Sequence, residues 1–343
     1  MRLRPFAALS AVALSAILLA GCSGSGGGDA TPSASASGAA DLCSSAAPSG
    51  AVSDGITVTG DFGAVPTVDF TKPVDTTDLT LQRTVQTEGS GAPIAAGDFV
   101  QYAATILDGS TGAVLSQAGY TPGEILPEQI SAENGGQIFG CATIGSRLTL
   151  ATATGDETTP SIVYVIDVLG VTPTAAWGED QAPVAGMPTV TLGDGGAPSI
   201  TIPEGQAAPS ETQVETLKKG DGAVVQPGNQ VLLQYTGVRW SNGETFDSTW
   251  DKGGVPTVLT TTGVVAGFQK ALEGQTAGSQ VLVTMTPADG YGEGEINTTD
   301  LKGETLVFVV DILYAGTLAA PEDTGTQESE EGAGGDEQPA GDE

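Results

Sequence analysis

The chain has 343 residues, of which 39% are hydrophobic and only 5% aromatic, and its 50 glycines indicate small cores separated by many turns. It carries 11 basic against 42 acidic residues and a formal net charge of −31. Such a chain cannot neutralise a run of phosphates, so nucleic acid and anionic lipid headgroups are excluded as partners. The absence of histidine excludes Ser-His and Cys-His nucleophile pairs and imidazole metal ligands. We therefore expect no cofactor and no metal site.

The N-terminus predicts an export signal over residues 1–21. Two arginines precede an apolar run, 7–20, that is too short for a membrane-spanning helix of about 20 residues. The run ends in a Leu-Ala-Gly-Cys motif that resembles a bacterial lipobox, which implies that Cys22 is lipidated and becomes the mature N-terminus. The alternative is a secretory signal whose cleavage site happens to hold a cysteine. Residues 22–42, rich in Gly, Ser and Ala, predict a flexible tether.

The cysteines support export to an oxidising compartment. The chain has three, and if Cys22 carries a lipid, Cys43 and Cys141 remain. We predict a disulfide between them that closes a long loop and restricts the unfolded chain by about 4 kcal/mol. The alternative is two unpaired buried thiols.

The chain repeats itself from residue 43 onward. Gly97-Asp98-Phe99-Val100 is echoed by Gly228-Asn229-Gln230-Val231, and the apolar run 162–169 by 306–313, in the same order along the chain. Two copies of one domain are predicted, over 43–172 and 205–316. The Pro- and Gly-rich stretch between them, 173–204, predicts a linker with a short lead-in strand.

Each copy is predicted to be α+β. Short apolar runs alternate with Gly and Asp/Asn turns, which predicts antiparallel strands. In the second copy, Phe268, Ala271 and Leu272 repeat at helical spacing and predict one short helix over 266–273. The acidic end, 317–343, has no aromatic residue and predicts a disordered tail.

The second copy resembles the FKBP-type peptidyl-prolyl cis-trans isomerases over a whole domain. The motifs that carry the resemblance stand in the family's order: Gln234-Tyr235-Thr236-Gly237, Phe246-Asp247-Ser248, Val264-Val265-Ala266-Gly267-Phe268, Gly290-Tyr291-Gly292 and the strand 305–313. The resemblance implies two tandem FKBP-like domains, each an antiparallel half-barrel sheet wrapped on one short helix. Between sheet and helix it implies an apolar pocket for a proline ring.

The resemblance assigns site residues only in the second copy. The walls of the pocket would be Tyr235, Phe246, Val264, Val265, Phe268 and Phe308. Asp247 and the hydroxyl of Tyr291 would form its polar rim, and the amide of Val265 would donate to a bound carbonyl. The sequence departs from the family in the acidic loop 293–301, where Ile296 or Leu301 is expected to cover the pocket, and in Lys252, which stands near a family arginine.

The first copy is a degenerate relative. Counting from Gly97 as from Gly228, Ala104 stands in place of Tyr235, and Leu115 and Ser116 replace Phe246 and Asp247. We therefore expect this copy to be structural or client-binding, without isomerase activity.

The sequence predicts a monomeric prolyl isomerase, lipid-anchored at the extracytoplasmic face of the bacterial cell membrane. Its partners would be proline-containing exported polypeptides and macrolide inhibitors. Rotation about an Xaa-Pro amide needs no covalent chemistry, because an apolar pocket favours the twisted amide over the planar, more polar one. The alternatives are a non-catalytic chaperone or peptide-binding lipoprotein and a β-rich surface adhesin.

Overall fold

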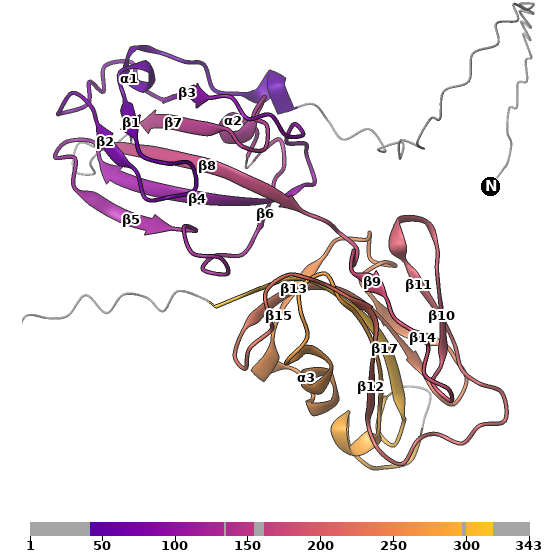
Figure 1. Ribbon diagram of the computed structural model, residues 1–343. Helices are drawn as coiled ribbons and strands as arrows, with labels where there is room; N and C mark the ends of the chain where they lie inside the picture. The colour runs from indigo at the N-terminus through magenta and orange to yellow at the C-terminus, as the bar shows by residue number, and fades with distance from the viewer. Residues whose placement is uncertain (1–41, 134, 154–160, 297–299, 318–343) are drawn as a thin grey trace, which may run out of the picture. The chain divides into compact units, whose positions relative to one another are not determined.

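The computed structural model describes residues 42–133, 135–153, 161–296 and 300–317 (Figure 1). The predicted export signal, Cys22, nearly all of the tether and nearly all of the acidic tail lie outside these residues. The described residues form two larger antiparallel sheets, one in each predicted copy. No helix within the described ranges is long and apolar enough to cross a bilayer.

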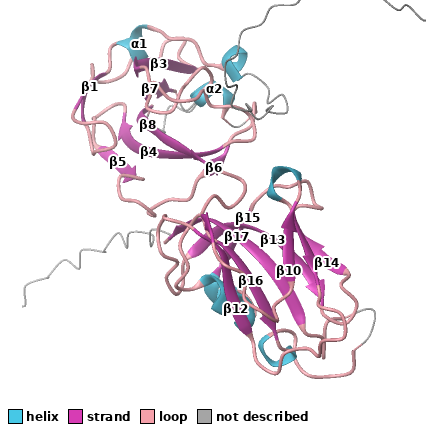
Figure 2. Ribbon diagram, turned by 45° about the vertical axis from the view of Figure 1, so that its right-hand side comes forward, coloured by secondary structure: helices cyan, strands magenta, loops and turns pink. Residues whose placement is uncertain are grey.

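The first domain is built on a sheet with the strand order β3-β7-β8-β4-β5, and β6 also pairs with β4 (Figure 2). Its strands are β3 (Leu81–Thr87), β4 (Phe99–Asp108), β5 (Val114–Ala118), β6 (Glu128–Gln129), β7 (Arg147–Thr152) and β8 (Ile162–Thr172). The remaining elements precede or join these strands: η1 (Leu42–Ser45), α1 (Ala51–Asp54), the hairpin of β1 (Thr57–Thr59) and β2 (Thr67–Asp69), and α2 (Gly136–Phe139).

The second domain is built on a sheet with the order β14-β13-β17-β16-β12-β9, and β15 also pairs with β13. Its strands are β9 (Glu179–Asp180), β12 (Gln213–Lys219), β13 (Gln230–Arg239), β14 (Thr245–Ser248), β15 (Thr257–Thr260), β16 (Gln280–Met285) and β17 (Leu306–Gly316). Strands β10 (Thr189–Leu192) and β11 (Pro198–Thr201) form a separate hairpin. The short 3-10 helices are η2 (Asp194–Gly196), η3 (Thr261–Gly263) and η4 (Pro287–Asp289). The predicted helix is confirmed as α3 (Ala266–Leu272).

The two sheets share one strand order. Strands β3-β7-β8-β4-β5 correspond to β12-β16-β17-β13-β14, and β6 corresponds to β15. The registers agree as well, because Ala104 lies opposite Ile166 as Tyr235 lies opposite Val310. The topology thus shows the internal repeat that the sequence predicts.

The stretch expected to be a linker, 173–204, is instead folded against the second domain. Strand β9 pairs with β12, and the hairpin β10–β11 lies against apolar side chains of the sheet. Met187 is buried there, and Val190 and Ile200 of the hairpin pack against the same cluster. These strands have only two to four residues each, and residues rich in Pro and Gly separate them. Such short strands show no hydrophobic periodicity from which they could be predicted.

The hairpin explains why β17 is buried along both faces. Phe308 and Val310 pack with α3, whereas Val307 and Val309 pack with the cluster that contains Met187. A strand covered on both faces needs a continuous apolar run rather than an alternating one. Each fully buried apolar side chain of this kind contributes about 1.5–3 kcal/mol.

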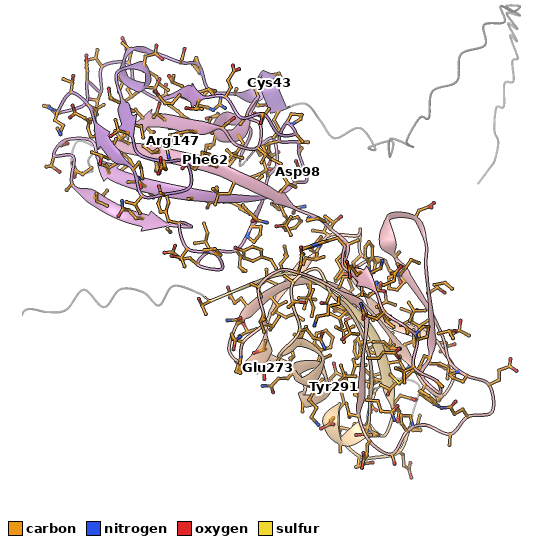
Figure 3. All side chains as sticks on the ribbon, viewed as in Figure 1. Cys43, Phe62, Asp98, Arg147, Glu273 and Tyr291 are labelled. Carbon is orange, nitrogen blue, oxygen red and sulfur yellow. A yellow bond between two sulfur atoms is a disulfide. The ribbon has the colours of Figure 1, made fainter. Side chains whose placement is uncertain are left out.

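A buried aspartate holds the segment that precedes the sheet in each domain. In the first, the Asp167 carboxylate accepts hydrogen bonds from Nε of Arg147, the residue labelled in Figure 3, at 2.6 Å and from the Gly63 amide at 2.7 Å. Arg147 also donates to the Gly60 carbonyl oxygen at 2.9 Å, in the loop of the first hairpin.

Among the described residues, both hydrogen-bond donors to the equivalent aspartate of the second domain are neutral. Asp311 accepts from Gln280 Nε2 at 2.8 Å and from the Ala176 amide at 2.9 Å. Burial raises the pKa of Asp311, although both hydrogen bonds oppose this change. Arg147 and Gln280 occupy equivalent positions, since each lies opposite its aspartate in the strand register.

Cys43 and Cys141 are joined in a disulfide, the pairing that the sequence predicts. The bond ties the start of the first domain to the residues just after α2, across a separation of 98 residues. In the entropic description a loop of this length restricts the unfolded chain by about 4–5 kcal/mol.

Candidate functional site

Every predicted pocket residue of the second domain lines one cavity of about 300 Å³. The cavity lies where α3 and the strands of the main sheet bury their apolar side chains together. Leu259 on β15 and Gly263 in η3 complete the lining, and the sequence did not single them out. The predicted residues in the lining are Tyr235, Phe246, Asp247, Val264, Val265, Phe268, Tyr291 and Phe308.

Aromatic rings form the apolar wall, with Phe308 at their centre. Its ring lies 5.2 Å from that of Phe268 and 5.3 Å from that of Phe246, each at an interplanar angle of 88°. The ring of Tyr235 lies 5.8 Å from Phe268 and 6.0 Å from Phe308. Edge-to-face contacts of this kind contribute about 0.5–1.5 kcal/mol each beyond burial and fix the rings in place. The wall is therefore rigid and apolar before any ligand arrives.

Gly237 on β13 makes this ring packing possible. A Cβ atom at this position would lie 2.6 Å from Phe308 Cε1 and 2.8 Å from Phe246 Cζ. Any larger side chain would therefore push two walls of the pocket out of position. Although Gly237 belongs to the Gln-Tyr-Thr-Gly motif, the sequence alone does not reveal this role.

A chain of three polar groups forms one edge of the pocket. The Tyr235 hydroxyl donates to Asp247 Oδ2 at 2.8 Å, and Lys252 Nζ lies 2.5 Å from Asp247 Oδ1. Burial acts to raise the pKa of Asp247, but hydrogen bonds from Lys252 and Tyr235 outweigh it, and the pKa is lowered. Burial and the bond to Asp247 raise the pKa of the Tyr235 hydroxyl. At neutral pH the edge thus holds a carboxylate paired with a lysine and a neutral phenol.

Two further polar groups lie beside the cavity. Tyr291 is 50% exposed, on the loop after β16, and Gly292 next to it has a φ of 93° (Figure 3). Val265 is the N-cap residue of α3, with extended backbone angles. The N–H group of an N-cap residue takes no part in the hydrogen bonds within the helix.

The acidic loop 293–301 is described only in part, since residues 297–299 lie outside the described ranges. Of the two residues expected to cover the pocket, Leu301 packs against the core beside α3, and Ile296 is 59% exposed. Neither of them lines the cavity.

The first domain lacks the side chains that make this site. The irregularity in register between β4 and β5 places Leu115 where Phe246 lies, and Ser116 where Asp247 lies. Leu115 is 53% exposed and does not contribute an aromatic wall. The replacements that the sequence predicts therefore hold in the strand register.

The described lining of the second-domain site suits the binding and orientation of an apolar group. Among the described residues that line it, Asp247 is the only acid and is paired with Lys252, and none is a Ser, Cys or Lys nucleophile. No group of three or more acidic or cysteine side chains in the described parts of the chain is arranged to hold a metal ion.

Comparison with known proteins points to one family. A family model described as FKBP-type peptidyl-prolyl cis-trans isomerase matches residues 222–313. A "Probable FK506-binding protein" of Corynebacterium glutamicum is 36% identical over 118 residues, which cover 34% of this chain and 98% of that protein. An "FK506-binding protein" of Streptomyces anulatus is 30% identical over 118 residues, covering 34% of this chain and 94% of its own length.

Among solved structures, FkpA from Escherichia coli is 20% identical and aligns over 40% of this chain and 54% of its own, with a TM-score of 0.29.

Proposed function

Because the chain belongs to the FKBP-type peptidyl-prolyl cis-trans isomerase family and is a peptidyl-prolyl isomerase, we propose that the pocket of its second domain is the active site. The observation that carries this proposal is the convergence of Tyr235, Phe246, Phe268 and Phe308 around one cavity with the carboxylate of Asp247 at its edge. We further propose that the sheet and α3 form the half-barrel of that family, with the pocket between them.

The proposed mechanism is stabilisation of the twisted amide. Rotation about an Xaa-Pro bond is opposed by a barrier of about 18–20 kcal/mol because the planar amide is stabilised by resonance. The twisted amide has lost resonance and part of its dipole, so an apolar, water-poor wall disfavours the planar ground state relative to it. The proline ring would rest on the faces and edges of Phe246, Phe268 and Phe308, which need no rearrangement to receive it.

The polar edge would orient the peptide. In our proposal the Tyr291 hydroxyl and the Val265 N–H bind carbonyl groups of the substrate on either side of the proline. Asp247 would hold the Tyr235 hydroxyl in position and lie near the carbonyl of the bond that rotates. Lys252 would keep Asp247 ionised and fixed, taking the place of the family arginine.

We propose that the substrates are exported polypeptides and that the protein is a monomer held by a lipid on Cys22 at the extracytoplasmic face of the bacterial membrane. The Leu-Ala-Gly-Cys motif and the disulfide between Cys43 and Cys141 support this location, because disulfides persist in oxidising compartments. In cells, Cys22→Ala should move the chain from the membrane fraction to the soluble fraction. Retention of the variant in the membrane would contradict the anchor.

Relatives named for FK506 binding extend the proposal to inhibitors. We propose that the same apolar pocket accepts a macrolide, since its aromatic wall and its volume of about 300 Å³ suit an apolar ring. Titration of the full chain with FK506 should then block peptide isomerisation at one equivalent.

The second candidate function is that of a non-catalytic chaperone. It is favoured by the first domain, which has the same strand order as the second but lacks the side chains of the proposed active site. Refolding of a test protein limited by a slow prolyl step distinguishes the two, because the uncatalysed step takes tens to hundreds of seconds. An isomerase accelerates the slow phase in proportion to its concentration. A chaperone without isomerase activity raises the yield of refolded protein and leaves the rate of the slow phase unchanged.

A further inference from the structure

The first domain contains a cavity of its own, at the position equivalent to the active site of the second. Its volume is about 420 Å³, against about 300 Å³ in the second domain. Its lining includes Ala104 on β4, Tyr164 on β8 and Phe139 in α2. The first domain therefore keeps an open cavity at the position where it lacks the aromatic side chains of the second domain.

Substitutions at equivalent positions explain the larger volume. Ala104 takes the position of Tyr235, which removes one ring from the wall. Counting back from Gly145 and Gly278, which share a positive φ, Gly135 takes the position of Phe268, which removes the ring on the helix. One ring remains, because Tyr164 lies opposite Ile106 as Phe308 lies opposite Gly237.

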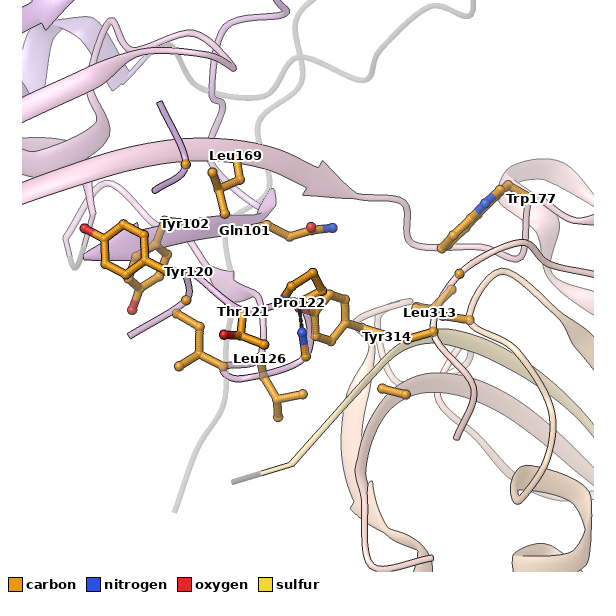
Figure 4. A pocket seen from close by; sticks show the side chains of 18 residues that line it. Gln101, Tyr102, Tyr120, Thr121, Pro122, Leu126, Leu169, Trp177, Leu313 and Tyr314 are labelled. Carbon is orange, nitrogen blue, oxygen red and sulfur yellow. Dashed lines mark hydrogen bonds between the residues drawn. The ribbon is translucent and has the colours of Figure 1, made fainter. Parts of the chain in front are cut away.

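Other aromatic rings give this cavity a different wall. Tyr102 on β4 contacts Phe139 with the ring centroids 6.0 Å apart. The Tyr102 side chain also lines a second pocket, which Figure 4 shows from close by. Together with Tyr164 these rings offer edges and faces to a planar guest. The cavity is larger than the one in the second domain, so it has room for a guest larger than a proline ring.

The charge of the lining differs as well. Glu128 pairs with Val100 as Leu259 pairs with Val231, so a carboxylate replaces one apolar wall of the second site. The Tyr102 hydroxyl donates to Glu128 Oε2 at 3.3 Å, and the described lining contains no lysine or arginine. Asp247 in the second domain has Lys252 beside it. The first cavity thus presents a carboxylate at an aromatic-lined opening.

We propose that this cavity binds an extended polypeptide segment through an aromatic side chain that has a lysine or arginine next to it in sequence. The aromatic group enters between Tyr102, Phe139 and Tyr164, and the cation pairs with Glu128. The cavity has no counterpart of Asp247, since Ser116 stands there, so it holds the segment without isomerising it.

The test is fluorescence anisotropy of labelled, proline-free peptides with the full chain. The probe is Gly-Ser-Lys-Phe-Lys-Ser-Gly, and its controls are Gly-Ser-Lys-Ala-Lys-Ser-Gly and Gly-Ser-Glu-Phe-Glu-Ser-Gly. The probe should bind about tenfold more tightly than either control, because burial of one aromatic side chain and one charge pair each favour it.

Two variants locate the binding. Ala104→Tyr places in the cavity the side chain that the second domain carries there, and should weaken probe binding about tenfold, with the far-UV circular dichroism unchanged as a check on the fold. Glu128 is exposed, so Glu128→Gln changes its charge without disturbing the core, and should weaken the probe about fivefold but not the Glu-Phe-Glu control.

Three results would overturn the proposal. Equal binding of the alanine control would mean a general attraction of basic peptides to this acidic chain. Binding unchanged in both Ala104→Tyr and Glu128→Gln would place the probe elsewhere. Loss of binding in Phe246→Ala, with Ala104→Tyr unaffected, would place it in the second domain.

Discussion

The two buried aspartates make a matched pair whose removal should change the free energy of unfolding by very different amounts. Asp167 is 1% exposed and bonded to Arg147, which is itself only 6% exposed. Asp167→Asn leaves that guanidinium buried without a countercharge and should lower the free energy of unfolding of the first domain by about 3–5 kcal/mol. Asp311→Asn, at the equivalent position, removes a buried carboxylate whose hydrogen-bond donors in the described structure are neutral, with Lys218 acting on it only through space. The neutral amide keeps an acceptor for the Ala176 amide, and Gln280 can turn its oxygen toward the new donor, so the change should be within about 1 kcal/mol.

The distribution of tryptophan separates the two domains in one experiment. Trp240 and Trp250 lie in the second domain, and Trp177 donates to Asp221 of that domain, so tryptophan fluorescence reports mainly on its unfolding. In urea titrations of the full chain, Asp167→Asn should move the transition seen by far-UV circular dichroism to lower urea and leave the tryptophan transition in place. Equal losses in the two variants, or a tryptophan transition that moves with Asp167→Asn, would refute the role assigned to the Arg147 pair.

Asp311 also predicts a dependence of stability on pH. Burial raises its pKa, so the folded state holds this proton more tightly than the unfolded state does. The contribution to stability is therefore fully present below the unfolded pKa of about 3.9 and is lost as pH rises through the higher folded value. Relative to wild type, Asp311→Asn should remove that part of the pH dependence from the tryptophan transition. An identical pH profile in the variant would contradict the assignment.

The remaining predictions concern the active site and the hairpin. Lys252→Met removes the main hydrogen-bond donor that lowers the pKa of Asp247, so the acidic loss of isomerase activity should move to higher pH; a profile identical to wild type would argue against the pair. Gly237→Ala should displace the rings of Phe246 and Phe308 and reduce the isomerisation rate about tenfold or more, and a wild-type rate would contradict the packing argument. Met187→Ala should lower the free energy of unfolding, followed by tryptophan fluorescence, by about 2–3 kcal/mol, because Met187 is only 7% exposed where it packs against the sheet. No change would be expected if residues 173–204 were an unpacked linker.

The strands of the second domain follow from local apolar runs, in which Tyr235 and Phe308 lie. The pocket was implied by the resemblance of the motifs to the FKBP family, and in the structure Phe246 and Phe268 line the same cavity. Leu259 and Gly237 were missed because their roles depend on which strands pair and on how closely two rings approach a backbone. Neither the strand pairing nor the approach of the rings can be inferred from the sequence of residue types alone.

The hairpin of β10 and β11 leaves one trace in the sequence of β17. A sheet with a solvated outer face alternates apolar and polar residues, but Val307 and Val309 on the outer face of β17 are both apolar. A continuous apolar run of that kind predicts a cover on both faces. The covering strands themselves, four residues each in β10 and β11, are too short to be recognised from their own sequence.

The most direct test of the central claim is the rate of cis-trans isomerisation of an Xaa-Pro peptide, measured without a coupled protease on the full chain. Phe246→Ala and Asp247→Ala should each lower the rate, the first nearly to the uncatalysed value. Leu115→Ala, at the position in the first domain equivalent to Phe246 and 53% exposed, is the matched control and should match wild type. Wild-type rates from both second-domain variants, or loss of activity in Leu115→Ala, would contradict the assignment of catalysis to the second pocket.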